Sequence, residues 1–301
     1  MLRYRSHAKI NLFLEVGALR DDGFHEIRTT MQTVSLADEL TFERAGAGVI
    51  TVTCDAPDIP GGEENLVHRA AVLLRAHAGD ASLGARIHIA KRVPAGAGLG
   101  GGSSNAACAL IALSKLWHLD TDERTLIHLA AKLGSDVPFF LYGGAAHCTG
   151  RGERVFPCRS LPTSQEFLLV TPNVHVSSAF AYNELDRFRL TSGFTAPKMG
   201  PPEEDMPGPG ALVKRLYNSF DEVVLPAFPI IRDVKSRMAG HCSSHVILSG
   251  SGSSLFGVLA PPGVERDFVS EFADCRLAKV VHPTDHGIVS IPPVAGDEPR
   301  G

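Results

Sequence analysis

The sequence predicts an α+β fold, in which strands and helices follow one another irregularly rather than as repeated βαβ units. Residues 8–16 and 85–94 alternate apolar and polar side chains, which is typical of strands. Residues 66–79 and 104–119 instead repeat apolar side chains at helical spacing. The chain has 301 residues, 44% of them hydrophobic, which is enough for two domains of ordinary size with buried cores.

Composition and charge exclude several classes of protein. The net charge is −4 and no basic tract occurs, so we expect no nucleic-acid partner. No apolar run approaches the roughly 18 residues of a membrane span, and Asn11 and Glu15 interrupt the apolar N-terminal stretch, which argues against a signal peptide. Six scattered cysteines without a CxxC pair predict reduced thiols in a cytoplasmic protein, and the histidines form no metal-binding motif.

The first part of the chain combines strands with a group of helices. Asn65 is placed to cap the helix at 66–79, and Ser103 or Ser104 is placed to cap the helix at 104–119. Thr121 or Asp122 can cap a further helix, which stops at Gly134. The remaining segments of this part are expected to be strands at 30–45 and 48–57, and a turn followed by a strand pair in 135–155.

A second set of elements begins at residue 167. We expect, in order, a strand at 167–176, a helix from Ser177 or Ser178 to 188, a surface insertion at 191–210 rich in Pro, Gly and acidic residues, Pro-interrupted helices in 217–240, and strand–turn–strand in 243–260. This organisation predicts a domain at 1–160, a second domain at 161–286 and a disordered tail at 287–301.

The 30 glycines gather in three segments. Five lie between Gly96 and Gly102, four in 143–152 and three in 248–257. Glycine next to serine lets backbone N–H groups approach an anion closely, and the first segment leads directly into a helix N-terminus. This pattern predicts a polyphosphate site.

Other known functions of glycine-rich segments fit this one less well. The string Gly96-x-Gly98-x-x-Gly101 fits a dinucleotide fingerprint, but a second helix follows where that fold needs a strand. A Walker A loop needs a lysine that is absent, and the chain has neither HRD nor DFG of a protein kinase. A serine hydrolase using Ser104, Asp136 and His282 stays as a remote alternative, since eight residues separate the strand from the serine.

The segment PAGAGLGGGSSNAA (94–107) resembles the phosphate-binding motif of the GHMP kinase superfamily. Four segments, in their order along the chain, resemble the family of 4-diphosphocytidyl-2-C-methyl-D-erythritol kinases. They are the opening AKINLFLEVGALRDDGFHEIRT, the triple glycine of this motif, LGSDVPFFLYGGAAHCTGRGE and the closing LSGSGSSLFGVL. The resemblance reaches to about residue 260. It implies a two-domain fold, with an N-terminal ATP-binding domain and a C-terminal ferredoxin-like α/β sandwich.

The activity implied by this resemblance is transfer of the γ-phosphoryl group of ATP, with Mg²⁺, to the 2-hydroxyl of 4-diphosphocytidyl-methylerythritol. Asp136 would accept the hydroxyl proton, and Lys9 would stabilise the negative charge and keep Asp136 ionised. A GHMP kinase for another alcohol, such as homoserine or mevalonate, is the nearest alternative.

The resemblance also assigns binding residues. Those expected to contact ATP are Asn65, Lys91, Pro94, Ala95, Gly96, Ala97, Gly98, Leu99, Gly100, Gly101, Gly102, Ser103 and Ser104. Those expected to contact the acceptor are Asn11, Phe24, His25, Ser178, Tyr182, Gly250 and Gly252. Phe24 departs from the tyrosine usual in the family. Two of these residues also fit a structural role: Asn65 as a helix cap, and Tyr182 as a side chain that packs its helix against the protein core.

Overall fold

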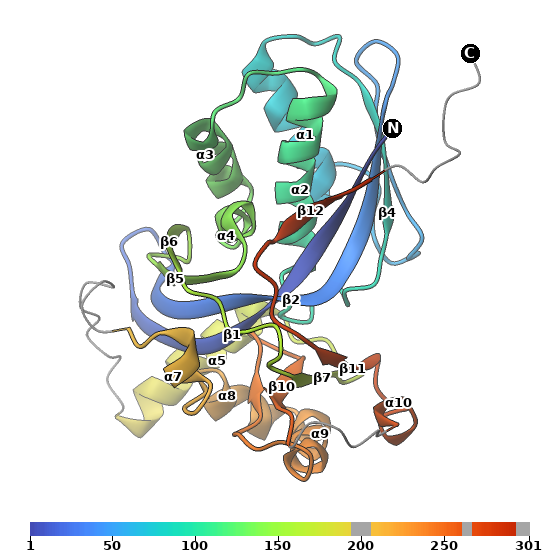
Figure 1. Ribbon diagram of the computed structural model, residues 1–301. Helices are drawn as coiled ribbons and strands as arrows, with labels where there is room; N and C mark the ends of the chain where they lie inside the picture. Colours follow the sequence, from blue (N-terminus) through green and yellow to red (C-terminus); the bar gives the residue numbers. More distant parts are fainter. Residues whose placement is uncertain (194–205, 261–266, 293–301) are drawn as a thin grey trace.

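The computed structural model describes residues 1–193, 206–260 and 267–292 and contains two β-sheets (Figure 1). The larger, eight-stranded sheet has the order β12-β1-β2-β4-β3, with β5, β6 and β8 attached beside it. The smaller sheet is antiparallel and has the order β11-β7-β10-β9. This mixture confirms the α+β prediction.

The first part of the chain forms most of the larger sheet and the helices above it. Its elements are β1 (Leu2–Leu19), β2 (His25–Arg44), β3 (Ile50–Cys54), α1 (Leu66–Ala78), β4 (Ala85–Ala90), α2 (Gly101–Leu116), α3 (Glu123–Leu133), α4 (Val137–Tyr142), β5 (Ala145–Thr149) and β6 (Arg154–Cys158).

The later part contributes the smaller sheet and its helices. Its elements are β7 (Phe167–Thr171), α5 (Ser178–Ser192), α7 (Pro209–Leu212), β8 (Tyr217–Asn218), α8 (Asp221–Ala227), α9 (Pro229–Ala239), β9 (Ile247–Leu248), β10 (Leu255–Val258), α10 (Phe268–Glu271), β11 (Leu277–Val281) and β12 (Ile288–Ile291).

Helices α1 to α4 lie on one side of the larger sheet, in the upper part of Figure 1. The core between them is filled largely by α2, whose small side chains Ala106, Ala107, Ala109 and Ala112 are fully buried. Small side chains let this helix approach α1 and β1 closely. The glycine segment that precedes α2 is thereby held against the sheet.

The smaller sheet is covered on both faces. Leu168, Val170 and Leu255 face the helices α5, α8 and α9, whereas Leu169 and Phe256 pack in a second cluster with Ala8, Ile10 and Leu12 of β1. Alternate residues of each strand therefore belong to different cores, as the pleat requires. The sheet is consequently packed against the long β1–β2 hairpin, which lies between the two parts of the molecule (Figure 1).

Most predicted elements are confirmed, although β1 and β2 begin earlier than the predicted 8–16 and 30–45, and the strands predicted at 85–94 and 167–176 end earlier. Two larger differences concern helices. Helix α2 begins at Gly101, with Gly100 as its N-cap, and not at Ser103 or Ser104. The segment after Asp136 is a short helix, α4, before the expected strand pair. At α2, packing into the core overrides the low helix propensity of glycine, whereas at α4 Pro138 lies in the first turn, where proline suits a helix start.

The expected tail at 287–301 was also wrong in part. Residues Ile288–Ile291 form β12, which pairs antiparallel with β1 from Arg3 to Ser6 because their backbone N–H groups complete the edge of the sheet. Residues 293–301 lie outside the described residues. Within the expected insertion, 191–192 end α5 and 209–210 begin α7, whereas 194–205 are not described. The division into domains at residue 160 stays a prediction.

Candidate active site

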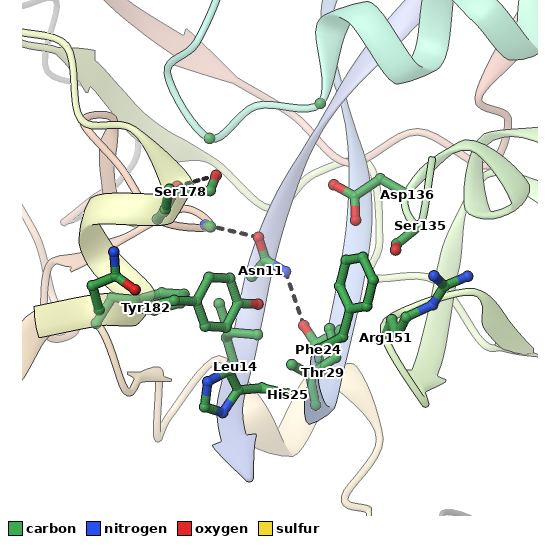
Figure 2. Close-up of a pocket in the computed structure, with 18 of the residues that line it drawn as sticks. Asn11, Leu14, Phe24, His25, Thr29, Ser135, Asp136, Arg151, Ser178 and Tyr182 are labelled. Carbon is green, nitrogen blue, oxygen red and sulfur yellow. Dashed lines mark hydrogen bonds between the residues drawn. The ribbon is translucent and has the colours of Figure 1, made fainter. Parts of the chain in front are cut away.

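A cavity of about 660 Å³ lies where β1, the first glycine segment, α5 and the Gly250 turn meet (Figure 2). We call the part formed by Lys9, Asp136, Gly98 and Gly100 the loop end, and the part formed by Phe24, His25, Tyr182 and Asp186 the aromatic end. The other lining residues are Asn11, Leu14, Leu19, Gly23, Ile27, Thr29, Ser135, Arg151, Ser178, Ala179, Asn183, Phe220, Gly250 and Ser251.

Lys9 and Asp136 form an ion pair at the loop end. Lys9 Nζ lies 3.8 Å from Asp136 Oδ2, and the lysine side chain is only 3% exposed. Asp136 is the N-cap residue of α4, but its carboxylate makes no capping hydrogen bond and faces the cavity (Figure 2). Burial lowers the pKa of Lys9, and the charge of Asp136 opposes that shift. The cavity therefore holds an available carboxylate beside a buried amine.

Asn11 connects Lys9 to the Gly250 turn. Its Oδ1 accepts hydrogen bonds from Lys9 Nζ (2.6 Å) and from the backbone N–H of Gly250 (2.9 Å). Its Nδ2 donates to Thr29 Oγ1 at 2.9 Å, which fixes which end of the amide faces the lysine. Asn11 was predicted as an acceptor-binding residue, and its contacts within the protein give it a further part in orienting Lys9.

The first glycine segment is tied to its surroundings by backbone contacts. The carbonyl of Leu99 accepts from the N–H of Lys9 at 3.0 Å, and that of Gly98 accepts from Ser249 Oγ at 3.0 Å. Gly98 has φ +78°, and a Cβ there would lie 1.9 Å from the Ser249 carbonyl oxygen. Only glycine fits such a position, so the segment can pass between β1 and the Gly250 turn.

Of the residues expected to contact ATP, Gly98 and Gly100 line the cavity. The side chains of Ala97 and Leu99 are buried in the protein, which leaves only their backbone for a ligand. Ser104 is fully buried and accepts a hydrogen bond from Ser6 Oγ at 2.6 Å. A hydrolase nucleophile must be reachable by its substrate, so this placement counts against the Ser104 alternative.

Asn65 and Lys91 lie outside the lining of this cavity. Asn65 Oδ1 accepts from the N–H of Val67 at 2.9 Å and caps α1. Lys91 Nζ forms a buried ion pair with Asp38, and a Cβ on Gly101 would lie 2.9 Å from the same Nζ. The amine of Lys91 is therefore next to the N-terminus of α2. Their predicted contact with ATP stays a prediction.

Aromatic rings form the opposite end of the cavity. The ring of Tyr182 stacks on that of His25, with centroids 5.2 Å apart and planes 14° apart. The rings of Tyr182 and Phe220 are T-shaped, with centroids 4.9 Å apart. Burial raises the pKa of Tyr182 to about 12. Phe24 is 51% exposed, and the guanidinium of Arg151 lies 4.8 Å from its ring centroid. The rings of Phe24 and Tyr182 and the cation of Arg151 thus all line the cavity, and Figure 2 shows the two rings on opposite sides of it.

His25 is held by two acceptors. Its Nδ1 lies 3.2 Å from the Gly17 carbonyl oxygen, and its Nε2 lies 3.2 Å from Asp186 Oδ2. Sequence reasoning missed Asp186 and Arg151. The spacing of Tyr182 and Asp186, four residues apart in an expected helix, is the signal that could have placed both on one face.

The remaining predicted acceptor residues divide between the lining and its support. Ser178 and Gly250 line the cavity, and Ser178 Oγ is hydrogen-bonded to Ser251 Oγ at 3.0 Å. Gly252 lies outside the lining. Among the described residues, no group of three or more His, Cys, Asp or Glu is placed to hold a metal ion. Within the same ranges, no helix has the length and apolar character needed to cross a bilayer.

Comparison with known proteins agrees with this geometry. Residues 65–144 match the GHMP kinases N terminal domain. The 4-diphosphocytidyl-2-C-methyl-D-erythritol kinase of Synechococcus sp. (strain CC9605) is 37% identical over 93% of this chain and 91% of its own length. The enzyme of the same name from Pelotomaculum thermopropionicum is 38% identical over 85% and 88%.

Solved structures give the same result. A crystal structure of 4-(cytidine 5'-diphospho)-2C-methyl-D-erythritol kinase has a TM-score of 0.72 at 34% identity and covers 93% of this chain and 99% of its own. Homoserine kinase from Cytophaga hutchinsonii has a TM-score of 0.64 at 18% identity, covering 96% and 97%, which shows a common fold alone. These likenesses confirm the predicted GHMP kinase fold. The chain therefore belongs to the 4-diphosphocytidyl-2-C-methyl-D-erythritol kinase family.

Proposed function

We propose that this chain transfers the γ-phosphoryl group of ATP to the 2-hydroxyl of 4-diphosphocytidyl-2-C-methyl-D-erythritol. The observation that carries the proposal is the composition of one cavity. It holds the buried Lys9 paired with a partly exposed Asp136 beside a glycine segment at the loop end, and stacked aromatic rings at the aromatic end. The names of the relatives, which identify kinases of this substrate, support the same reaction.

Asp136 is the proton acceptor in this proposal. As the hydroxyl oxygen attacks the γ-phosphorus, its proton passes to the Asp136 carboxylate, and the bond between the γ-phosphorus and the leaving oxygen of ADP breaks. Lys9, 3.8 Å away, stabilises the ionised carboxylate and the negative charge that collects on the transferred group. The Asn11 hydrogen bond keeps the amine directed at this position.

The glycine segment and the start of α2 bind the phosphates. Backbone N–H groups at a helix N-terminus attract negative charge, and Gly98 and Gly100 leave their backbone open to the cavity. The half-buried Ser103 offers a hydroxyl oxygen of the kind that Mg²⁺ accepts, and this ion is usually held by phosphates with few protein ligands. Bound there, Mg²⁺ would neutralise charge on the phosphate oxygens.

The aromatic end suits the cytidine of the acceptor. Phe24 and Tyr182 present apolar ring faces for stacking, and His25 presents a polar edge. Phenylalanine at position 24 keeps the stacking surface and loses the hydroxyl of the usual tyrosine. Homoserine and mevalonate carry no base and would leave this end unfilled.

All six cysteines are free thiols, which supports the expected cytoplasmic location.

The test is an ATP-consumption assay with purified protein and a panel of alcohols. We expect phosphorylation of 4-diphosphocytidyl-2-C-methyl-D-erythritol, and at least about 100-fold lower kcat/KM for homoserine and mevalonate, since neither reaches the aromatic end. Preferential phosphorylation of either small alcohol would overturn the substrate. Labelling of Ser104 by a fluorophosphonate, without ATP consumption, would favour the hydrolase.

A further inference from the structure

We propose that Asp186, acting with His25, makes the aromatic end selective for cytosine over uracil. The inference rests on the proposed function, because it concerns the base of the acceptor. Asp186 belongs to α5, lines the cavity, and has a side chain that is 42% exposed. It is therefore a carboxylate that a ligand can reach, next to the ring that is expected to read the base.

The hydrogen bonds of His25 define the polarity of its edge. The Gly17 carbonyl oxygen can only accept, so the Nδ1 atom that faces it carries a proton. The same carbonyl accepts from Arg189 Nη1 at 3.0 Å, which holds it in place. Nε2 lies 3.2 Å from Asp186 Oδ2, and in that contact the carboxylate oxygen accepts, which assigns the donor role to Nε2–H.

The result is an N–H donor beside a carboxylate acceptor. Asp186 Oδ2 is directed at Nε2, and Oδ1 has no hydrogen-bond partner among the residues that the structure describes. Because Asp186 is the more exposed partner, a base entering the cavity can share or displace the contact with Nε2 while the buried bond to Gly17 persists.

This arrangement matches cytosine and conflicts with uracil. Cytosine presents an amino group, which donates, next to ring and carbonyl acceptors, so its amino group meets the carboxylate and its acceptor meets Nε2–H. Uracil has a carbonyl oxygen where cytosine has the amino group, and that oxygen would face the carboxylate. An unpaired, repelled acceptor is a strong basis for discrimination.

The other groups at this end cannot supply the same selectivity. The rings of Phe24 and Tyr182 stack on any pyrimidine, because every base has a π-face. The Asn183 amide, which also lines the cavity, carries both a donor and an acceptor and fits either base. A fixed negative charge is what distinguishes the two bases, and Asp186 provides it.

Calorimetric binding of CDP and UDP to the whole chain tests the proposal directly. We expect the unaltered protein to bind CDP about 10- to 100-fold more tightly than UDP. In Asp186→Asn the amide can donate to the uracil oxygen, so the preference falls at least about 10-fold through stronger UDP binding. In Asp186→Ala the preference falls through weaker CDP binding instead.

Glu184→Gln is the matched control. Glu184 belongs to the same helix, and its change to Gln removes the same charge. The residue lies outside the cavity lining, with Glu184 Oε1 3.8 Å from Arg187 Nη1. It should keep the unaltered preference. With the full acceptor, Asp186→Asn should raise KM and leave kcat within about threefold, because Asp186 does not touch the reacting atoms.

Equal binding of CDP and UDP by the unaltered protein, or an unchanged preference in Asp186→Asn, overturns the role of Asp186. A protein that prefers CDP in the expected manner, loses the preference in the variant and yet phosphorylates nothing would overturn the proposed function alone. Thermal unfolding of each variant confirms that the comparison is made between folded proteins.

Discussion

The two ends of the cavity are built in different ways. At the loop end, Lys9 is 3% exposed and is held by Asn11, by the carbonyl of Leu99 and by the charge of Asp136. At the aromatic end, Phe24 is 51% exposed, and Arg151, whose guanidinium lies beside its ring, comes from the loop between β5 and β6. Backbone and buried groups form the first end, whereas side chains form the second.

The difference reflects what each end must do. Proton and phosphoryl transfer lose rate when the reacting groups move by a fraction of an ångström, so those groups need fixed partners. Stacking on a base tolerates small shifts, because its energy depends on the area of contact. We therefore expect changes at the loop end to act on turnover or folding, and changes at the aromatic end to act on acceptor affinity and selectivity.

The largest effect should come from Asp136→Asn. The amide cannot accept the hydroxyl proton, so kcat should fall by about 10²- to 10⁴-fold while KM for the acceptor stays within about threefold. Steady-state kinetics measure both. Asp233→Asn, on an exposed side chain of α9, is the control and should leave kcat unchanged. A rise in KM equal to the fall in kcat would contradict the separation of the two ends.

The pH dependence of turnover should be the next largest effect. Burial lowers the pKa of Lys9. As the pH is raised, Lys9 therefore loses its proton before a free lysine does, whose pKa is about 10.4. Above the lowered pKa, kcat should fall up to about tenfold per pH unit, and Lys9→Arg, although slower, should lack this alkaline fall.

Unfolding would not explain that loss. Between the lowered pKa and the ordinary one, the unfolded chain binds more protons at Lys9 than the folded chain does, so this residue makes the free energy of unfolding rise with pH. Thermal unfolding over the same range distinguishes the two causes. A kcat that stays constant up to pH 10 would contradict either the lowered pKa of Lys9 or the need for its charge.

The smallest effect concerns the packing of the glycine segment. In Gly98→Ala the new Cβ would meet the Ser249 carbonyl oxygen at 1.9 Å, and φ is +78°, so the free energy of unfolding should fall by about 1–3 kcal/mol. Gly102→Ala is the matched control, since the nearest atom, Leu66 Cδ1, lies 3.7 Å away and alanine favours the helix. Equal melting temperatures for the two variants would show that the segment is not tightly packed.

Local signals in the sequence predicted much of the fold. Asn65 was predicted to cap the helix at 66–79, and it caps α1 in the structure, which ends at Ala78 with Gly79 as its C-cap. The start of α2 was predicted too late, because glycines favour a loop in isolation. In the folded protein Gly101 packs against Val93 and Lys91, where no larger residue fits, and that contact depends on the whole sheet.

The site was less accessible to local reasoning. Lys9 and Asp136 are far apart in the chain and were paired only through resemblance to a family. The spacing of α5 places Asp186 on the same helix face as Tyr182, but it does not show that His25, at the start of β2, reaches that face. Hydrogen bonds between distant segments are a property of the tertiary fold, which sequence patterns describe poorly.

The strand β1 runs along the whole cavity, and this sets a length. Lys9 lies on it at one end, and Gly17, whose carbonyl holds His25, lies on it at the other. A strand rises about 3.3 Å per residue and cannot stretch, so the eight steps from Lys9 to Gly17 span no more than about 26 Å. β1 therefore fixes the distance between the two ends of the cavity. An acceptor that lacks one phosphate is too short for its base and its hydroxyl to reach both ends at once.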